Sequence, residues 1–228
     1  NVVDKSKNMD WYEGPTMLYH LETVYIGSDH NHVDARFPVQ WVIRPHSDEY
    51  HDFRGYAGRV AGGVFRPGDE VVVQPSVFST RIKAIESYDG PQETTFAPLS
   101  CTITLEDEID ISRGDMIVSP SRAPSVTKRI EAMVCWLAEA PLEPGRKYVV
   151  RHTTRETKAL VAAIEVRQDI NELKRVAGGR LDMNDIGSVT FKLAQPLFVD
   201  PYSENRATGA FILIDEATNN TVGAGMIV

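Results

Sequence analysis

From residue 37 onward, apolar residues recur at every second position in short runs, and glycine, proline and aspartate separate these runs. Alternation of this period is the pattern of a strand with one buried face. We expect six strands in the first stretch, at residues 37–44, 56–61, 69–75, 79–87, 100–105 and 115–118. Short strands separated by turns at this spacing predict a small closed barrel.

A second set of strands follows a polar segment at residues 119–125, whose two prolines and three serines are typical of a linker. We expect these strands at residues 127–138, 147–152, 156–167, 187–199, 208–215 and 221–227. Residues 168–178 predict either one helical turn or a long loop, because Ile170, Leu173 and Val176 are three apart. The chain is therefore expected to be all-β, with two consecutive closed barrels of about 80 to 110 residues each.

Residues 1–26 have a different pattern. Thr16 follows a Gly-Pro break and precedes apolar residues at helical spacing, which predicts an N-cap and a short helix near residues 16–24. The chain starts with Asn1 and lacks the features of a signal peptide, so we expect it to be a piece of something longer. The expected domains are residues 1–34, a remnant and connector, and two barrels at residues 35–120 and 121–228.

Composition excludes some classes of protein. Disorder is excluded because 42% of the residues are apolar and the charges are dispersed. The longest apolar run, residues 132–138, is far shorter than the roughly 20 residues of a membrane span. Cys101 and Cys135 sit in apolar stretches, which favours buried reduced thiols and a cytoplasmic location over a disulfide or a reactive thiol.

Charge is uneven along the chain. Residues 1–120 hold 10 Lys and Arg against 19 Asp and Glu, a net charge of −9, whereas residues 121–228 hold 14 against 13. Because nucleic-acid affinity rests on basic side chains that neutralise phosphates, the acidic first half speaks against nucleic acid and favours a protein partner. We expect no membrane partner.

The sequence contains no catalytic constellation. Residues 58–63 approach a phosphate-binding loop but lack its lysine and hydroxyl, so these glycines are expected to let strands bend or approach closely. His30 and His32 with flanking carboxylates could clamp a metal, but a solvated loop is favoured. Residues 46–48 and 51–52 hold the residue types of a hydrolase triad without a nucleophile turn. The acidic residues 106–110 could form a divalent-ion site or an acid/base pair, but a solvated strand end is favoured.

We therefore expect no catalytic, cofactor-binding or metal-binding residue in this chain. Arg54, Tyr56 and Arg59 combine two guanidinium groups and an aromatic ring at a strand entrance. Such residues suit a protein interface, and they equally suit a barrel rim or stacking on a nucleotide end. We assign these three residues to a partner interface as a hypothesis.

Eight sequence segments resemble those of a known protein family, and the resemblance covers nearly the whole chain. The segments are FPVQWVIRP at 37–45, HDFRGYAG at 51–58, RPGDEV at 66–71, LEDEIDISRGD at 105–115, NDIG at 184–187, DPY at 200–202, NRATGAFILID at 205–215 and TVGAGM at 221–226. These segments resemble the large, GTPase subunit of bacterial sulfate adenylyltransferase, in the elongation factor Tu family. Generic translation factors share the Pro-Gly-Asp and Arg-Gly-Asp turns but not the carboxy-terminal segments.

The resemblance implies barrels of the elongation factor Tu domain II and domain III type. It also implies that NMDWYEGPT at residues 8–16 belongs to the last piece of a GTP-binding domain. The family couples GTP hydrolysis, with Mg²⁺, to the synthesis of adenosine 5'-phosphosulfate from ATP and sulfate, and a separate catalytic subunit binds ATP and sulfate. This chain lacks the P-loop sequence, so the resemblance implies docking and coupling here rather than chemistry.

Two alternatives stay open at this point. Translation-factor barrels would bind an aminoacylated RNA end, which the acidic first half disfavours. A freestanding scaffold without a partner is the other. A kinase domain after Val228, as in fused family members, is left undecided by the sequence.

Overall fold

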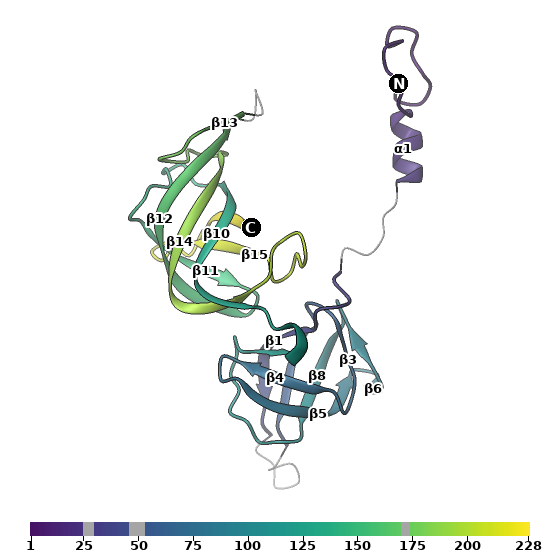
Figure 1. Ribbon diagram of the computed structural model, residues 1–228, viewed down its shortest axis with the longest axis vertical. Coiled ribbons are helices and arrows are strands. Elements are labelled where there is room, and N and C mark those ends of the chain that lie inside the picture. The colour runs from purple at the N-terminus through teal and green to yellow at the C-terminus, as the bar shows by residue number, and fades with distance from the viewer. Residues whose placement is uncertain (25–29, 46–52, 170–173) are drawn as a thin grey trace.

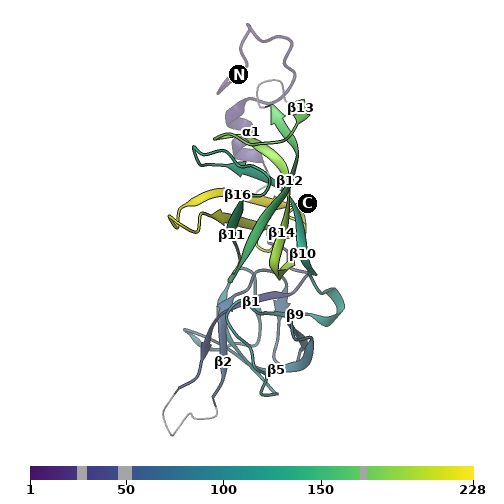
Figure 2. The ribbon, with the colours of Figure 1, turned by 90° about the vertical axis from the view of Figure 1, so that its left-hand side faces the viewer.

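The computed structural model describes residues 1–24, 30–45, 53–169 and 174–228. Figures 1 and 2 show two β-barrels, joined by a short connection, and a helix that stands apart from both. The elements are α1 (Met17–Thr23), β1 (Arg36–Ile43), β2 (Gly55–Arg59), β3 (Val64–Phe65), β4 (Glu70–Gln74), β5 (Phe78–Ser87), β6 (Gly90–Pro91), β7 (Thr95–Phe96), β8 (Ser100–Leu105), β9 (Met116–Val118), a 3₁₀ turn (Pro120–Arg122), β10 (Ser125–Trp136), β11 (Lys147–His152), β12 (Arg155–Asp169), β13 (Lys174–Ala177), β14 (Ile186–Val199), β15 (Ala210–Ile214) and β16 (Thr221–Ile227).

The first barrel closes through six strands in the order β4-β9-β1-β2-β8-β5, because β5 pairs back onto β4. All of the pairs are antiparallel, and alternate residues such as Phe37, Val39 and Ile103 are fully buried inside. Gly58 pairs with Val39, and a Cβ at this glycine would lie 2.5 Å from the Pro38 carbonyl oxygen. The expected role of the glycines at residues 58–63 in close strand approach is confirmed at this position.

The second barrel also closes through six strands, in the order β11-β15-β16-β10-β14-β12, with β12 pairing back onto β11. Its strands are longer, and β12 and β14 run for 15 and 14 residues. The interior is filled around Trp136, Phe191 and Phe211, and the rings of Phe191 and Phe211 meet edge to face at 5.8 Å. Two closed barrels confirm the all-β prediction, and all twelve expected strands are present.

Residues 168–178 correct one expectation. Gln168 and Asp169 continue β12, and β13 pairs with β12 in antiparallel register, so the helical turn or loop expected here is wrong for the described residues. Ile170 and Leu173 lie outside the described residues. The strand was missed because β13 is exposed on almost every residue and therefore carries no alternation of buried and exposed positions.

The predicted helix near residues 16–24 is confirmed as α1. The Thr16 hydroxyl accepts a hydrogen bond from the Tyr19 N–H and so caps the helix as expected. None of its residues is buried, and Leu21 is 61% exposed. With seven residues, α1 is too short to cross a bilayer. No helix among the described residues is long and apolar enough to do so.

Candidate functional site

The contact zone between the two barrels is built around a buried ion pair, and we call this zone the seam. Arg36 opens β1 of the first barrel, and Asp200 follows β14 of the second. The Arg36 Nε and Nη2 groups donate to the two carboxylate oxygens of Asp200 at 2.9 and 2.8 Å. With two parallel hydrogen bonds the pair is bidentate. Both residues are buried, at 2% and 7% exposure, so the pair is shielded from water.

The remaining hydrogen-bonding capacity of the pair is also used. Arg36 Nη1 donates to the carbonyl oxygens of Ala35 and Arg122, and the latter belongs to the connection between the barrels. Asp200 accepts a hydrogen bond of 2.6 Å from the hydroxyl of the buried Thr208. Since a buried ion pair is stable only when its other donors and acceptors are satisfied, this network holds the barrels in one arrangement.

His152, at the end of β11, supports the same network from inside the second barrel. Its Nε2 lies 2.7 Å from the Thr208 carbonyl oxygen, and because a carbonyl can only accept, Nε2 carries the proton. Burial lowers the pKa of His152 below its ordinary value of 6.5, against the opposing effects of the Thr208 hydrogen bond and the Asp200 charge. The imidazole is therefore neutral at pH 7.

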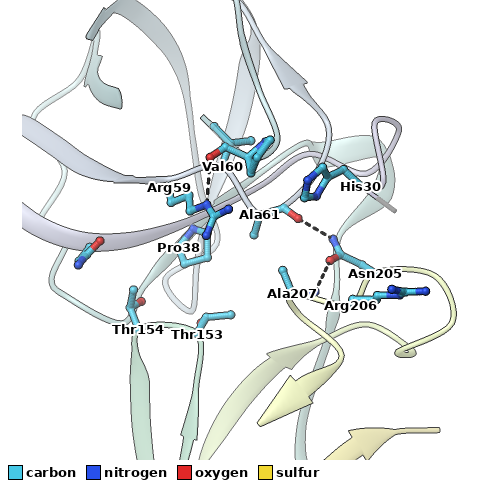
Figure 3. A pocket seen from close by; sticks show the side chains of 12 residues that line it. His30, Pro38, Arg59, Val60, Ala61, Thr153, Thr154, Asn205, Arg206 and Ala207 are labelled. Carbon is cyan, nitrogen blue, oxygen red and sulfur yellow. Dashed lines mark hydrogen bonds between the residues drawn. The ribbon is translucent and has the colours of Figure 1, made fainter. Parts of the chain in front are cut away.

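The loop at residues 200–209 supplies a second link across the seam. Asn205 is 2% exposed, and its side-chain amide donates to the Ala61 carbonyl oxygen of the first barrel at 3.2 Å. Its side-chain oxygen accepts from the Ala207 N–H at 2.9 Å, which fixes the loop (Figure 3). A Cβ on Gly62 would lie 2.6 Å from the Asn205 amide nitrogen, so only glycine permits this approach.

A second ion pair crosses the seam in the opposite direction. Arg155, which opens β12, lies 3.4 Å from the Asp115 carboxylate and donates to the Gly114 carbonyl oxygen at 3.2 Å. Its guanidinium also lies 5.0 Å from the ring centre of Phe198. Phe198 packs with Val72 and other apolar residues of the first barrel, so β14 adds an apolar contact to the seam.

A pocket of about 510 Å³ opens beside the Asn205 link. Both barrels and the segment before β1 line it, and Figure 3 shows how the side chains face one another. The lining residues are His30, Pro38, Gln40, Arg59, Val60, Ala61, Pro98, Thr153, Thr154, Asn205, Arg206 and Ala207. Among the described residues that line it, the ionisable side chains are those of one histidine and two arginines, and none is a carboxylate.

The three residues assigned to an interface differ in how far the structure exposes them. Tyr56 is 1% exposed and donates its hydroxyl to the Ile109 carbonyl oxygen, and burial raises its pKa. Arg54 is half-buried and donates to the same oxygen at 3.1 Å, whereas Arg59 is exposed and lines the seam pocket. Tyr56 thus offers almost no surface. Positions 56 and 59 are an odd number of residues apart on one strand, which already indicates opposite faces.

The other candidate groups do not assemble. The rings of His30 and His32 lie 6.4 Å apart, and no described group of three potential metal ligands includes them. Glu106, Asp107 and Glu108 are exposed, as expected. The triad residue types at His46, Ser47, Asp48, His51 and Asp52, and the flanking Asp29, lie outside the described residues. Both cysteines are free thiols, but Cys135 is only half-buried, which corrects the expectation of two buried thiols.

Comparison with known proteins shows which proteins this chain is similar to. A family model described as GTP-eEF1A C-terminal domain-like matches residues 129–228. Over the whole chain, 52% of the residues are identical to the bifunctional enzyme CysN/CysC of Mycobacterium tuberculosis, and the match covers 38% of that protein. Sulfate adenylyltransferase subunit 1 of Bacteroides fragilis is 44% identical over the whole chain and is covered to 47%. The chain is homologous to part of sulfate adenylyltransferase subunit 1.

The chain spans less than half the length of these curated relatives. Among solved structures, sup35 complexed with GMPPNP matches with a TM-score of 0.76 at 16% identity, covering 100% of this chain and 55% of that one. At this identity the match shows the fold alone, and it confirms the elongation factor Tu type of barrel pair. The segments DPY and NRATG, which resemble the sulfate adenylyltransferase branch, form the loop at residues 200–209. This loop carries Asp200, Asn205 and Thr208 of the seam.

Proposed function

We propose that this chain is the barrel region of the GTPase subunit of a sulfate adenylyltransferase, and that it serves docking and coupling. The observation that carries the proposal is the 52% identity over the whole chain to CysN/CysC. The parent protein would couple GTP hydrolysis to the synthesis of adenosine 5'-phosphosulfate from ATP and sulfate. The chemical steps would take place outside these residues.

Coupling has a physical requirement that the seam meets. A mixed anhydride of phosphate and sulfate is strongly uphill to form, so another reaction must drive it. Energy passes between two sites only if a change of state at one alters affinity or chemistry at the other. Two barrels joined by the buried Arg36–Asp200 pair can transmit such a change as one body.

GTP and Mg²⁺ would bind in a part of the parent protein that this sequence does not contain, since it has no P-loop sequence. We assign residues 1–34 to the end of that GTP-binding domain and to a connector, residues 35–120 to the domain II-like barrel and residues 121–228 to the domain III-like barrel. The exposed apolar residues of α1 support the first assignment, because an apolar face without a partner indicates a missing neighbour. The free thiols support a cytoplasmic location.

The partner would be the ATP- and sulfate-binding catalytic subunit. Within the first barrel, Arg59 and the half-buried Arg54 are the proposed contacts, and Tyr56 would act by fixing the Ile109 carbonyl that Arg54 also uses. Arginine is enriched at the centre of interfaces, where its planar group pairs with carboxylates.

Size-exclusion chromatography of this chain with the catalytic subunit tests the proposal. We expect a complex that survives chromatography and that the double change Arg54→Glu and Arg59→Glu weakens. Arg66→Glu is the matched control, because Arg66 is an exposed arginine in a turn of the same barrel. Separate elution of the two wild-type proteins would refute docking by this region.

Binding of an aminoacylated RNA end is the alternative class. We expect filter binding with transfer RNA to show only weak, strongly salt-dependent retention, because the first half of the chain carries a net charge of −9. Retention at physiological salt would favour the alternative.

Isothermal calorimetry with GTP should give no heat of binding for this chain.

A further inference from the structure

Trp41 lies on the outside of the first barrel, although strand alternation would place it inside. Val39, two residues earlier on β1, is fully buried, and residues two apart on a strand normally share a face. The pairing of β1 with β2 contains a β-bulge, in which Gln40 is an extra residue on β1. The bulge turns Trp41 outward and leaves it 66% exposed. A large apolar side chain that the backbone turns into water indicates a surface with a partner.

Small side chains beside Trp41 form the floor of a groove. Trp41 pairs with Ala57 on β2, and Ala57 pairs with Thr102 on β8. Thr102 pairs in turn with Glu86 on β5, so this row crosses four strands of the outer surface. Trp41 forms one wall of the hollow, and the fully exposed Tyr88, in the turn after β5, forms the other. We call this hollow, of about 570 Å³, the Trp41 groove.

Arginine side chains border the groove. Arg113 Nη1 donates to the Gln40 carbonyl oxygen at 3.0 Å, which holds the side chain at the groove. In the described part of the chain, the other two nitrogens of this guanidinium make no hydrogen bond or ion pair. Arg59 pairs with Ser100, which lines the groove, so the groove continues to a contact already proposed for the partner. Among the described residues that line the groove, Glu86 is the one carboxylate.

The composition of the groove favours a protein as its occupant. Tryptophan, tyrosine and arginine are the residue types that carry most of the binding energy at protein interfaces, and Trp41, Tyr88 and Arg113 line this groove together. An apolar side chain of a partner would fit over the small floor between the aromatic walls. A carboxylate beside it would pair with the available Arg113 nitrogens. A nucleic-acid phosphate, by contrast, would approach Glu86 in a first half with a net charge of −9.

We propose that the Trp41 groove docks the catalytic subunit, through a segment in which aspartate or glutamate flanks an exposed apolar side chain. This inference rests on the proposed function for the identity of the partner. Docking covers the Trp41 surface that the bulge exposes, and it pairs Arg113 with a carboxylate. The groove thus extends the interface from isolated arginines to an aromatic centre with a charged border.

Isothermal calorimetry of this chain with the catalytic subunit measures the contribution of the aromatic wall. Trp41→Ala should weaken binding at least about tenfold, because an interface residue of this type at the centre carries a large share of the affinity. Its melting temperature should stay close to that of wild type, since the side chain is exposed. Phe78→Ala is the matched control, because Phe78 is a 61% exposed aromatic residue of the same barrel that does not line the groove.

A charge reversal tests the border of the groove. Arg113→Glu should weaken binding more than Arg113→Gln, because the new carboxylate faces a carboxylate of the partner. Arg81→Glu is the matched control, since Arg81 is exposed and also donates through Nη1 to one carbonyl oxygen, that of Gly68. Equal affinities of Arg113→Glu and Arg113→Gln would overturn the acidic character of the docking segment.

Fluorine NMR locates the contact directly. The chain labelled with 5-fluorotryptophan gives signals from Trp11, Trp41 and Trp136, and Trp41→Phe assigns the signal of interest. We expect the Trp41 signal to shift when unlabelled catalytic subunit is added, whereas the signal of Trp136, which is 1% exposed, should stay in place.

The outcomes separate the groove from the proposed function. If the wild-type chain binds the catalytic subunit but Trp41→Ala binds equally well and the Trp41 signal does not move, the groove alone is overturned. If the wild-type chain does not bind, the proposed function fails, and this occupant of the groove fails with it. A shift of the Trp41 signal with transfer RNA at physiological salt would overturn a protein as the occupant.

Discussion

Among the described residues, two arginine–aspartate pairs cross the seam, and they differ in how completely their hydrogen-bonding groups are paired. Arg36 reaches from the first barrel to Asp200 in a bidentate pair whose side chains are 3% and 10% exposed. Arg155 reaches back from the second barrel to Asp115 through a single contact of 3.4 Å, with side chains that are 15% and 17% exposed. The same residue types thus make one shielded fork and one looser contact.

The difference shows what makes a buried pair hold a structure together. Three nitrogens of Arg36 donate to described acceptors, and Thr208 donates to Asp200. By contrast, the buried Arg155 Nε has no partner among the described residues. Burial raises the pKa of Asp115 despite the nearby Arg155 charge. We infer that the first pair fixes the arrangement of the barrels and that the second contributes mainly through contacts around Phe198.

The largest effect should follow from breaking the first pair. Arg36→Met leaves the buried Asp200 carboxylate without its partner, so we expect the free energy of unfolding to fall by about 3 to 5 kcal/mol. Urea denaturation measures this loss. The double change Arg36→Met and Asp200→Leu should restore much of it, because replacing both charges removes the unpaired group. A loss below about 1 kcal/mol in the single variant contradicts a fixing role.

Breaking the second pair should cost less. Arg155→Met keeps the apolar stem over Phe198 and removes the charge-assisted hydrogen bonds, so we expect a loss of about 2 kcal/mol. Arg151→Met, in the exposed pair with Glu156, is the control and should cost between about 0 and 1 kcal/mol. If Arg155→Met proves as damaging as Arg36→Met, the contrast between the two pairs does not hold.

The smallest effect concerns the support of the first pair by His152. Because its pKa is lowered in the folded chain, the unfolded chain binds more protons below pH 6.5, and stability falls as the pH drops below that value. One group can change stability by at most about 1.4 kcal/mol per pH unit. Melting temperatures between pH 7.5 and 5 should show a shallower decline for His152→Gln than for wild type. The exposed-histidine variant His20→Gln should behave as wild type does.

The barrels could be predicted from the sequence because alternation of buried and exposed residues is local information. Every expected strand is present. The strands that were not expected are β3, β6 and β7, of two residues each, and β13, which lacks a buried face. The seam could not be predicted in this way, since Arg36 and Asp200 are 164 residues apart and meet only after both barrels have closed. Nothing near Arg36 in the sequence identifies its partner.

The candidate pocket shows the same limit. Arg59 was identified from its residue type, but Thr153 and Thr154 carried no signal, because two threonines between two strands are unremarkable in a sequence. They line the pocket beside Arg59 only because the two barrels meet there, which the folded chain alone reveals. Tyr56 is 1% exposed, and strand alternation already indicates this, because it places residues 56 and 59 on opposite faces of β2.

The connection between the barrels runs from Val118, the last residue of β9, to Ser125, the first of β10, and Arg36 binds the Arg122 carbonyl oxygen within it. So short a tether keeps the two seam surfaces at an effective concentration of about millimolar or more. Contacts too weak to assemble two separate chains at micromolar concentration therefore suffice within one chain. Such a seam can remain small and polar and still be fully occupied.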